Sequence, residues 1–294
     1  RQEIVAITAA MPDSTGLLPF SERFPDRFFD VGIAEQHATT AAAGMAMSGL
    51  RPVVAIYATF LNRAFDQIAF DVGLHELPVI FCLDRAGITG PDGASHHGLL
   101  DMMLMSKIPG MTIFAPSSYQ ELQQMFQDAF EITEGPVCIR YPRTPAPTVL
   151  ETEIGKGTQA RKVQSGKDVC ILAIGKMLGP AKEAAKALKQ KGIECGIWDV
   201  RCVAPLDMAM LEDAHHHPVV ITIEDGITEG GIGSIIQSKL SKLDGRGPIV
   251  RTMGVPSSYI PQGNADEILS KLGLDSEGII KESLLAHKLL QSDN

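Results

Sequence analysis

The stretch LPVIFCLDRAGITGPDGASHHG, residues 77–98, changes abruptly from apolar to polar and thereby indicates the fold. Its first seven residues form a continuous apolar run, which is typical of a strand covered by helices on both faces of a sheet. The rest of the stretch includes four glycines and two adjacent histidines. Because ligands of open parallel sheets bind beyond the carboxyl ends of the strands, it predicts a buried strand that opens into a ligand-binding loop.

Similar apolar runs alternate with helical patterns through the first half of the chain. Gly49 is placed to stop one helix, and Ser118 to start another. Strands that alternate with helices imply a parallel sheet. The strands are expected at 3–8, 27–33, 52–57, 78–84, 111–116 and 136–141, and the helices at 34–49, 60–75 and 117–133.

The second half repeats this alternation after a segment rich in Pro, Gly and Thr. Strands are expected at 167–175, 193–200, 218–225 and 248–255, and helices at 179–192, 205–217, 230–243, 265–274 and 277–291. The composition of the intervening segment is typical of a linker. We therefore predict two α/β domains with mostly parallel sheets covered by helices, at 1–146 and 167–294, joined by a linker at 147–166.

The composition limits the class of function. Apolar residues make up 45% of the 294 residues and charged residues 21%, as in globular proteins that bury a core. The net charge of −9 argues against nucleic acid and anionic membrane surfaces as partners. No apolar run approaches the roughly 20 residues that a membrane-spanning helix needs.

The cysteines and the first residue concern the origin of the chain. Five cysteines are scattered without a CxxC pair, so neither a zinc site nor a disulfide framework is indicated. We expect a reducing, cytoplasmic compartment. The chain starts without Met and enters a strand at once, so we expect it to be part of a longer protein.

Two residues stand where predicted strands end and helices begin. Glu35 opens a helix, where a carboxylate either complements the helix dipole or acts as a partly buried general acid or base. Phe60 follows another strand, where an aromatic ring is either part of the core or a stacking platform for a ligand. The residues alone leave both alternatives open.

Three arginines, Arg63, Arg85 and Arg143, follow strands of the same predicted sheet. Guanidinium groups gathered in an otherwise acidic protein are what an anion such as a phosphate requires. The polar loop adds Asp92 and His96 to this edge. One histidine of this loop is expected to act as a donor or acid near neutral pH.

Other motifs are interpreted as structural, and no metal ligand is predicted. The adjacent histidines of the loop diverge and do not complete a convergent zinc set. The histidines at 215–217 precede Pro218 at a predicted helix end, where they suit the helix dipole. GITEGGIG, residues 226–233, lacks the spacing of a dinucleotide or P-loop site and is interpreted as a tight strand-to-helix turn.

Together, the strand-end motifs resemble the thiamin-diphosphate enzymes of the transketolase superfamily, and within it the 1-deoxy-D-xylulose-5-phosphate synthases. The resemblance covers nearly the whole chain and implies a pyrimidine-binding domain followed by a transketolase C-terminal domain. The third of its motifs is the most discriminating. The motifs are FFDVGIAEQHA (28–38), VVAIYATFLNRAFDQI (53–68), DRAGITGPDGASHHG (84–98), IRYPR (139–143) and GVPSSYIPQG (254–263).

The resemblance implies a role for each candidate residue. Glu35 matches the catalytic glutamate that hydrogen-bonds the aminopyrimidine ring of the cofactor, which promotes deprotonation of the thiazolium carbon and makes it a nucleophile. Phe60 matches the aromatic residue stacked on the pyrimidine. The residues that match substrate-holding ones are Tyr57, Arg63, Arg85, Asp92, His96 and Arg143, of which His96 is also expected to be catalytic.

The implied reaction joins pyruvate, with loss of carbon dioxide, to glyceraldehyde 3-phosphate. Its product feeds isoprenoid, thiamin and pyridoxal synthesis. The family also carries a GDG motif, followed some way downstream by Asn, that holds magnesium and the diphosphate, and this sequence has no GDG. We therefore expect the magnesium ligands in a missing N-terminal domain, a homodimer, and negligible turnover by this chain alone.

Two other interpretations remain open. The chain could be the second subunit of a split transketolase or a 2-oxo-acid dehydrogenase β subunit, although the loop motif at 84–98 argues against both. It could also be a non-catalytic scaffold for dimerisation. The joint presence of Glu35, Phe60 and the arginines argues against a scaffold.

Overall fold

The apolar runs of the amino-terminal half pair into a seven-stranded sheet, in a computed structural model that describes residues 1–292. The strand order is β10-β5-β6-β4-β3-β1-β2, and every pair except β10 with β5 is parallel. The central strands β3 and β4 are buried along almost their whole length, as expected under two layers of helices. The strands are β1 (Ile4–Thr8), β2 (Phe28–Asp30), β3 (Arg51–Tyr57), β4 (Ile80–Asp84), β5 (Thr112–Phe114), β6 (Val137–Arg140) and β10 (Cys202–Ala204).

One helix of this half begins where its capping residue predicts. The side chain of Ser118 accepts a hydrogen bond from the Glu121 amide at 3.1 Å and so caps α6. The helices are α1 (Leu18–Arg23), α2 (Glu35–Met47), α3 (Ala58–Leu61), α4 (Phe65–Gln67), α5 (Asp101–Met105) and α6 (Tyr119–Glu131), with the shorter turns η1 (Pro25–Arg27) and η2 (Asn62–Ala64) and the π-helical η3 (Ile68–Gly73).

The stretch predicted as helical at 60–75 is helical as far as Gly73, but it is not one regular α-helix. Its winding changes in turn through α3, η2, α4 and η3. Its buried side chains are three residues apart at Ala58, Leu61 and Ala64, and then four apart at Ile68 and Val72. A spacing of three residues suits the tighter 3₁₀ winding of η2.

The carboxyl-terminal half forms a five-stranded sheet in the order β12-β11-β8-β9-β7, which is parallel except for β7. Its strands are β7 (Arg161–Gln164), β8 (Val169–Ala173), β9 (Cys195–Asp199), β11 (Val219–Ile227) and β12 (Ile249–Val255). Its helices are η5 (Gly175–Met177), α7 (Leu178–Gln190), α8 (Met208–His215), α9 (Ile232–Leu240), α10 (Ala265–Lys271) and α11 (Ser276–Ser292). No helix within residues 1–292 is both long and apolar enough to cross a membrane.

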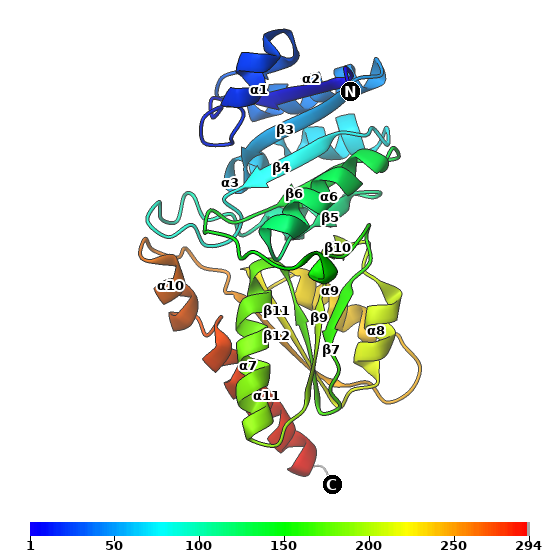
Figure 1. Ribbon diagram of the computed structural model, residues 1–294, viewed down its shortest axis with the longest axis vertical. Helices are drawn as coiled ribbons and strands as arrows, with labels where there is room; N and C mark the ends of the chain where they lie inside the picture. Colours follow the sequence, from blue (N-terminus) through cyan, green and yellow to red (C-terminus); the bar gives the residue numbers. More distant parts are fainter. Residues whose placement is uncertain (293–294) are drawn as a thin grey trace.

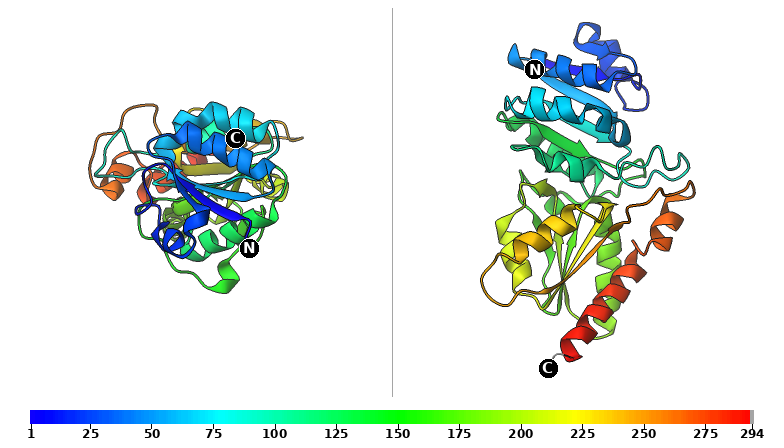
Figure 2. Two further views of the ribbon diagram at one scale, coloured as in Figure 1. Left: turned by 90° about the horizontal axis from the view of Figure 1, so that it is seen from above. Right: turned by 180° about the vertical axis from the view of Figure 1, so that it is seen from behind.

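The two sheets lie one above the other along the long axis of the molecule (Figure 1). In the lower sheet, α7 and α11 pack together on one face, and α9 lies on the opposite face (Figures 1 and 2). Strand β10 belongs to the second half of the chain but pairs with β5 of the first sheet. One hydrophobic cluster also runs from Ile7 and Val54 above to Leu172 and Val220 below. The halves therefore share a core.

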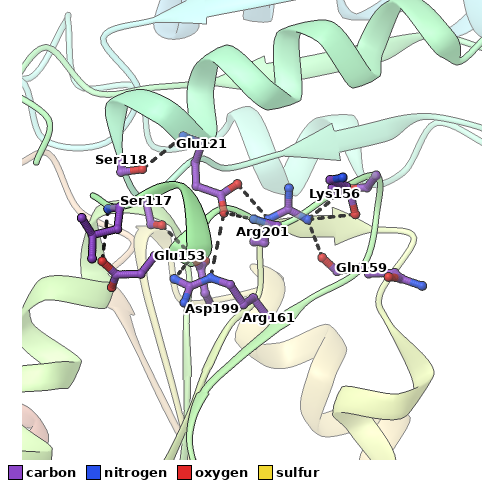
Figure 3. A network of polar contacts seen from close by, with 12 residues as sticks. Ser117, Ser118, Glu121, Glu153, Lys156, Gln159, Arg161, Asp199 and Arg201 are labelled. Carbon is purple, nitrogen blue, oxygen red and sulfur yellow. Dashed lines mark hydrogen bonds and ion pairs between the residues drawn. The ribbon is translucent and has the colours of Figure 1, made fainter. Parts of the chain in front are cut away.

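A buried polar network closes the joint between the sheets (Figure 3). Arg201, which is fully buried, donates from Nε to Oε2 of Glu121 in α6 at 2.8 Å. Asp199 accepts a hydrogen bond from Ser117 at 2.6 Å. Arg201 also donates from Nη1 to three carbonyl oxygens, those of Lys156, Gly157 and Gln159. The segment predicted as a linker contains η4 (Glu151–Glu153) and β7, and Arg201 fastens it to the joint.

Candidate active site

Glu35 is the first residue of α2 and lies at the edge of the first sheet where its parallel strands end. Glu35 is 1% exposed, which is unusual for a residue with a carboxylate side chain. The amino end of a helix favours negative charge, and Glu35 occupies that end of α2. Within residues 1–292 its side chain has one partner, Arg63, whose Nη1 lies 3.4 Å from both Oε1 and Oε2.

Phe60 lies at the centre of the predicted residues. The ring of Tyr57 is stacked on it with 5.6 Å between centroids, and the ring of His96 meets it edge-on at 5.3 Å. The guanidinium carbon of Arg63 lies 5.7 Å from the centroid of the same ring. Phe60 is only half-buried, so part of the ring remains free to contact a ligand.

Arg85 joins this group from the loop after β4. Its guanidinium carbon lies 3.9 Å from the Tyr57 ring centroid, and its Nη1 donates to Oδ2 of Asp84 at 2.8 Å. Burial raises the pKa of Asp84 above its ordinary value, although Arg85 beside it opposes the shift. Arg85 has a φ of 59°, a conformation that costs energy in a residue other than glycine. The backbone is therefore strained at this position in the loop.

Arg143 and Asp92 form a second, more exposed pair. Nη1 of Arg143 donates to Oδ2 of Asp92 at 2.7 Å, with 46% and 31% of the two side chains exposed. A cavity of about 550 Å³ lies beside them between the loop and the start of α10, lined among others by Thr89 and Asn264. Six of the eight predicted site residues thus make one continuous group, and the other two pair with each other.

The glycines of the loop permit close approach, as the sequence predicts. Gly87, Gly90 and Gly93 have positive φ angles of 75°, 89° and 75°. A Cβ on Gly98 would lie 2.6 Å from the side chain of Ala58. The base of the loop is closed by two backbone hydrogen bonds between Gly87 and Gly98, at 2.7 and 2.9 Å.

A buried ionic cluster behind the loop was missed by the sequence analysis. Arg140 at the end of β6 donates to Asp101 at 2.9 Å and to Asp225 of β11 at 2.5 Å. Glu224 next to it is 2% exposed, and burial raises the pKa of its carboxyl group to about 7. The partners lie up to 85 positions apart, so no local pattern joins them.

Each histidine of the tract at 215–217 lies within hydrogen-bond distance of a backbone carbonyl oxygen. A group of three potential ligand atoms exists nearby, from Cys170, Asp213 and His217. Both ring nitrogens of His217 already face backbone carbonyl oxygens, at 2.8 and 2.9 Å. Asp213 accepts hydrogen bonds from Lys162 and Trp198. These side chains are committed to bonds within the protein.

Comparison with known proteins relates the sequence of this chain to a family. The description of the transketolase pyrimidine binding domain matches residues 1–148, and that of the transketolase C-terminal domain matches residues 158–279. A 1-deoxy-D-xylulose-5-phosphate synthase of Magnetococcus marinus is 49% identical over 286 residues, covering 94% of this chain and 45% of the relative. One of Geobacter sulfurreducens is 45% identical over 296 residues, covering 98% and 46%. The chain spans about half the length of these relatives.

Solved structures agree with this assignment. A split gene transketolase, described as an inactive β4 tetramer, superposes with a TM-score of 0.87 at 33% identity and covers 98% of this chain and 93% of that one. A transketolase of Pichia stipitis superposes with a TM-score of 0.81 at 18% identity, over 98% and 43%, which shows the fold alone. The predicted fold class is confirmed. The family model of the transketolase pyrimidine binding domain matches half of the chain. The split gene transketolase is 33% identical to the chain, which covers 93% of it. This chain therefore belongs to the transketolase family.

Proposed function

We propose that the chain forms the cofactor-activating and substrate-binding half of a 1-deoxy-D-xylulose-5-phosphate synthase. The observation that carries the proposal is the buried carboxylate of Glu35, which stands beside Arg63 and Phe60 at the ligand-binding edge of a parallel sheet. The two synthases described above, at 49% and 45% identity, support this choice over other thiamin-dependent reactions.

The residues present fit thiamin diphosphate, which contains an aminopyrimidine ring. Glu35 has a side chain that is 2% exposed and makes only two contacts of 3.4 Å, so it keeps the capacity to accept a stronger hydrogen bond. It would hold the proton at a pyrimidine nitrogen, and Phe60 would support the ring. When bound, the cofactor supplies a carbon nucleophile. We propose that the magnesium ligands lie outside this chain, in a diphosphate-binding domain.

The arginines suit the two anionic substrates, pyruvate and glyceraldehyde 3-phosphate. Arg63 and Arg143 are about half exposed, so their guanidinium groups are available to a ligand. An exposed ion pair such as Arg143–Asp92 contributes little stability, so a phosphate can replace Asp92 at low cost. Tyr57, Arg85 and His96 complete the substrate side of the site, and we propose His96 as a catalytic donor or acid.

Exposed apolar side chains support the proposal of partner surfaces. Ile33 is 79% exposed just before α2, and Phe70 and Leu74 are 63% and 70% exposed in and after η3. Apolar side chains gathered on packed neighbouring elements typically mark an interaction surface. We propose that a diphosphate-binding domain and a second copy of the chain pack here. The five free, buried cysteines support a reducing, cytoplasmic location.

One comparison favours a second candidate, the β subunit of a split transketolase. The split gene transketolase is matched over 93% of its length, whereas the synthases are matched over less than half of theirs. A subunit of this kind would receive the diphosphate-binding domain as a separate polypeptide. Its donor substrate would be a ketose phosphate rather than pyruvate.

The two candidates are separated by a choice of donor. The chain is combined with the part of the Magnetococcus marinus relative that it does not cover, as a fusion and as a separate polypeptide. We expect the assembly to release carbon dioxide from pyruvate and form product with glyceraldehyde 3-phosphate, and the chain alone to give negligible turnover. Turnover of a ketose phosphate but not of pyruvate would favour the split transketolase. Turnover of neither would favour the scaffold, and turnover by the chain alone would contradict our assignment of the missing half.

A further inference from the structure

The adjacent histidines of the loop face opposite sides of it. His96 meets the ring of Phe60 and lies 2.9 Å from the Ser95 hydroxyl. His97 is 5% exposed, and its Nδ1 accepts a hydrogen bond from the backbone N–H of Thr89 at 3.0 Å. An N–H donor requires an unprotonated acceptor, so Nδ1 carries no hydrogen and the neutral ring is protonated at Nε2. This hydrogen bond ties the two arms of the loop together beyond the Gly87–Gly98 pair at its base.

The same ring faces the carboxyl-terminal domain. The ring lines one cavity together with Ile260 of the segment after β12, and within residues 1–292 its buried Nε2 has no hydrogen-bond partner. Burial lowers the pKa of His97, whereas backbone groups of Pro261 and Ile260 act in the opposite direction. That segment also donates from the Gly263 amide to the Gly90 carbonyl oxygen at 3.2 Å. The loop and the segment leading into α10 project on the same side of the molecule (Figures 1 and 2). The loop therefore rests on the second domain through this backbone hydrogen bond and through Ile88, which is 1% exposed within the hydrophobic cluster of that domain.

A cavity lies beside the loop, next to His97. A space of about 460 Å³ lies between α3, the loop and the residues after β12, lined among others by Thr59, His97 and Ile260. Side chains do not fill this space, so packing alone does not fix the loop on that side. A loop freed from the Thr89–His97 hydrogen bond has room to shift, and the shift would carry His96 and Asp92 with it.

We propose that His97 is a positioning residue, which closes the substrate loop and seats it on the carboxyl-terminal domain so that His96 and Asp92 meet the phosphorylated aldehyde. The kinetic part rests on the proposed function. The structural part does not, because the order of the loop can be measured in the chain itself.

The test compares His97→Leu, which fills the space without an acceptor, with His97→Asn, whose Oδ1 can replace Nδ1. His216→Leu, at an exposed histidine, is the control. In the 294-residue chain, we expect the amides of residues 87–98 to exchange hydrogen about tenfold faster in His97→Leu and at the wild-type rate in His97→Asn and the control. In the assembled enzyme, we expect KM for glyceraldehyde 3-phosphate to rise about tenfold in His97→Leu, with KM for pyruvate unchanged and near wild-type values for His97→Asn.

Unchanged exchange in His97→Leu would overturn the proposal, as would equal losses in His97→Leu and His97→Asn. Equal increases in both KM values would also overturn it, because they indicate general loosening rather than positioning of the loop. If the wild-type assembly forms no product, the proposed function fails, and the exchange rates still decide the role of His97.

Discussion

At the scale of single residues, the loop geometry depends on what lies next to each glycine. Gly87 has a φ of +75°, and a Cβ built on it would lie 2.2 Å from Oδ2 of Asp225 in the other domain. Gly110 has the same φ of +75° but no atom within 4 Å of its Cβ position. The two glycines therefore separate the cost of a left-handed backbone from the cost of close approach.

This pair gives a matched prediction. Gly110→Ala should lower the free energy of unfolding by about 1 kcal/mol, the cost of placing an alanine in the left-handed region. Gly87→Ala should lower it by about 3 kcal/mol, because the added methyl group must also displace a buried carboxylate. Urea unfolding of both variants checks the difference. Equal losses would show that Asp225 moves aside freely.

At the scale of the elements, the carboxyl end of β11 brings negative charge beneath the substrate loop. Glu224 and Asp225 are 2% and 0% exposed, and Arg140 is the buried cation that pairs with Asp225. Glu224 accepts a hydrogen bond from the Gly233 amide at 2.8 Å. The strand end therefore holds more acid than its single arginine neutralises, and burial keeps a proton on Glu224.

The proton gives stability a definite pH dependence. The pKa of Glu224 rises from 4.5 to about 7 on folding, so between these values the folded state holds a proton that the unfolded state has lost. The contribution of Glu224 to the free energy of unfolding is then highest below this window and falls as pH rises through it, by about 3 kcal/mol. Glu224→Gln, which keeps an acceptor for Gly233, should lack this fall. If the free energy of unfolding changed equally in the two proteins from pH 4.5 to 7, the account would be contradicted.

The sequence predicts the elements whose patterns are local and long. The predictions at 34–49, 78–84 and 117–133 correspond to α2, β4 and α6 within a few residues. The short strands β7 and β10 were missed, since three or four residues carry little periodicity and their pairing depends on distant partners. The site divides in the same way. The strand-end motifs predict that Glu35 and the arginines share one edge of the sheet, whereas the Arg140 cluster depends on a contact across two domains.

At the scale of the whole molecule, a buried ion pair between Arg201 and Glu121 joins the two sheets. Figure 3 shows Arg201 directed at Glu121 on one side and at the linker on the other. Removing one partner of a buried ion pair leaves a charge without compensation, which costs about 3 to 5 kcal/mol. The joint therefore depends strongly on this arginine.

Arg201→Met tests the joint. The variant should unfold at a lower temperature, and trypsin should cleave it faster after the exposed Lys156, whose carbonyl oxygen Arg201 holds at 3.3 Å. Arg246→Met, at an exposed arginine, serves as the control and should behave as wild type. Cleavage after Lys156 at the wild-type rate would show that other contacts hold the linker.

The most direct test of the central claim is the turnover number of the assembled enzyme carrying Glu35→Gln. A buried carboxylate that holds a proton at the cofactor should be irreplaceable by an amide, so we predict a kcat about 10² to 10⁴ lower than wild type, with folding intact. Glu22→Gln, at an exposed glutamate on α1, should leave kcat unchanged. A Glu35→Gln enzyme that turns over pyruvate and glyceraldehyde 3-phosphate at the wild-type rate would contradict the account.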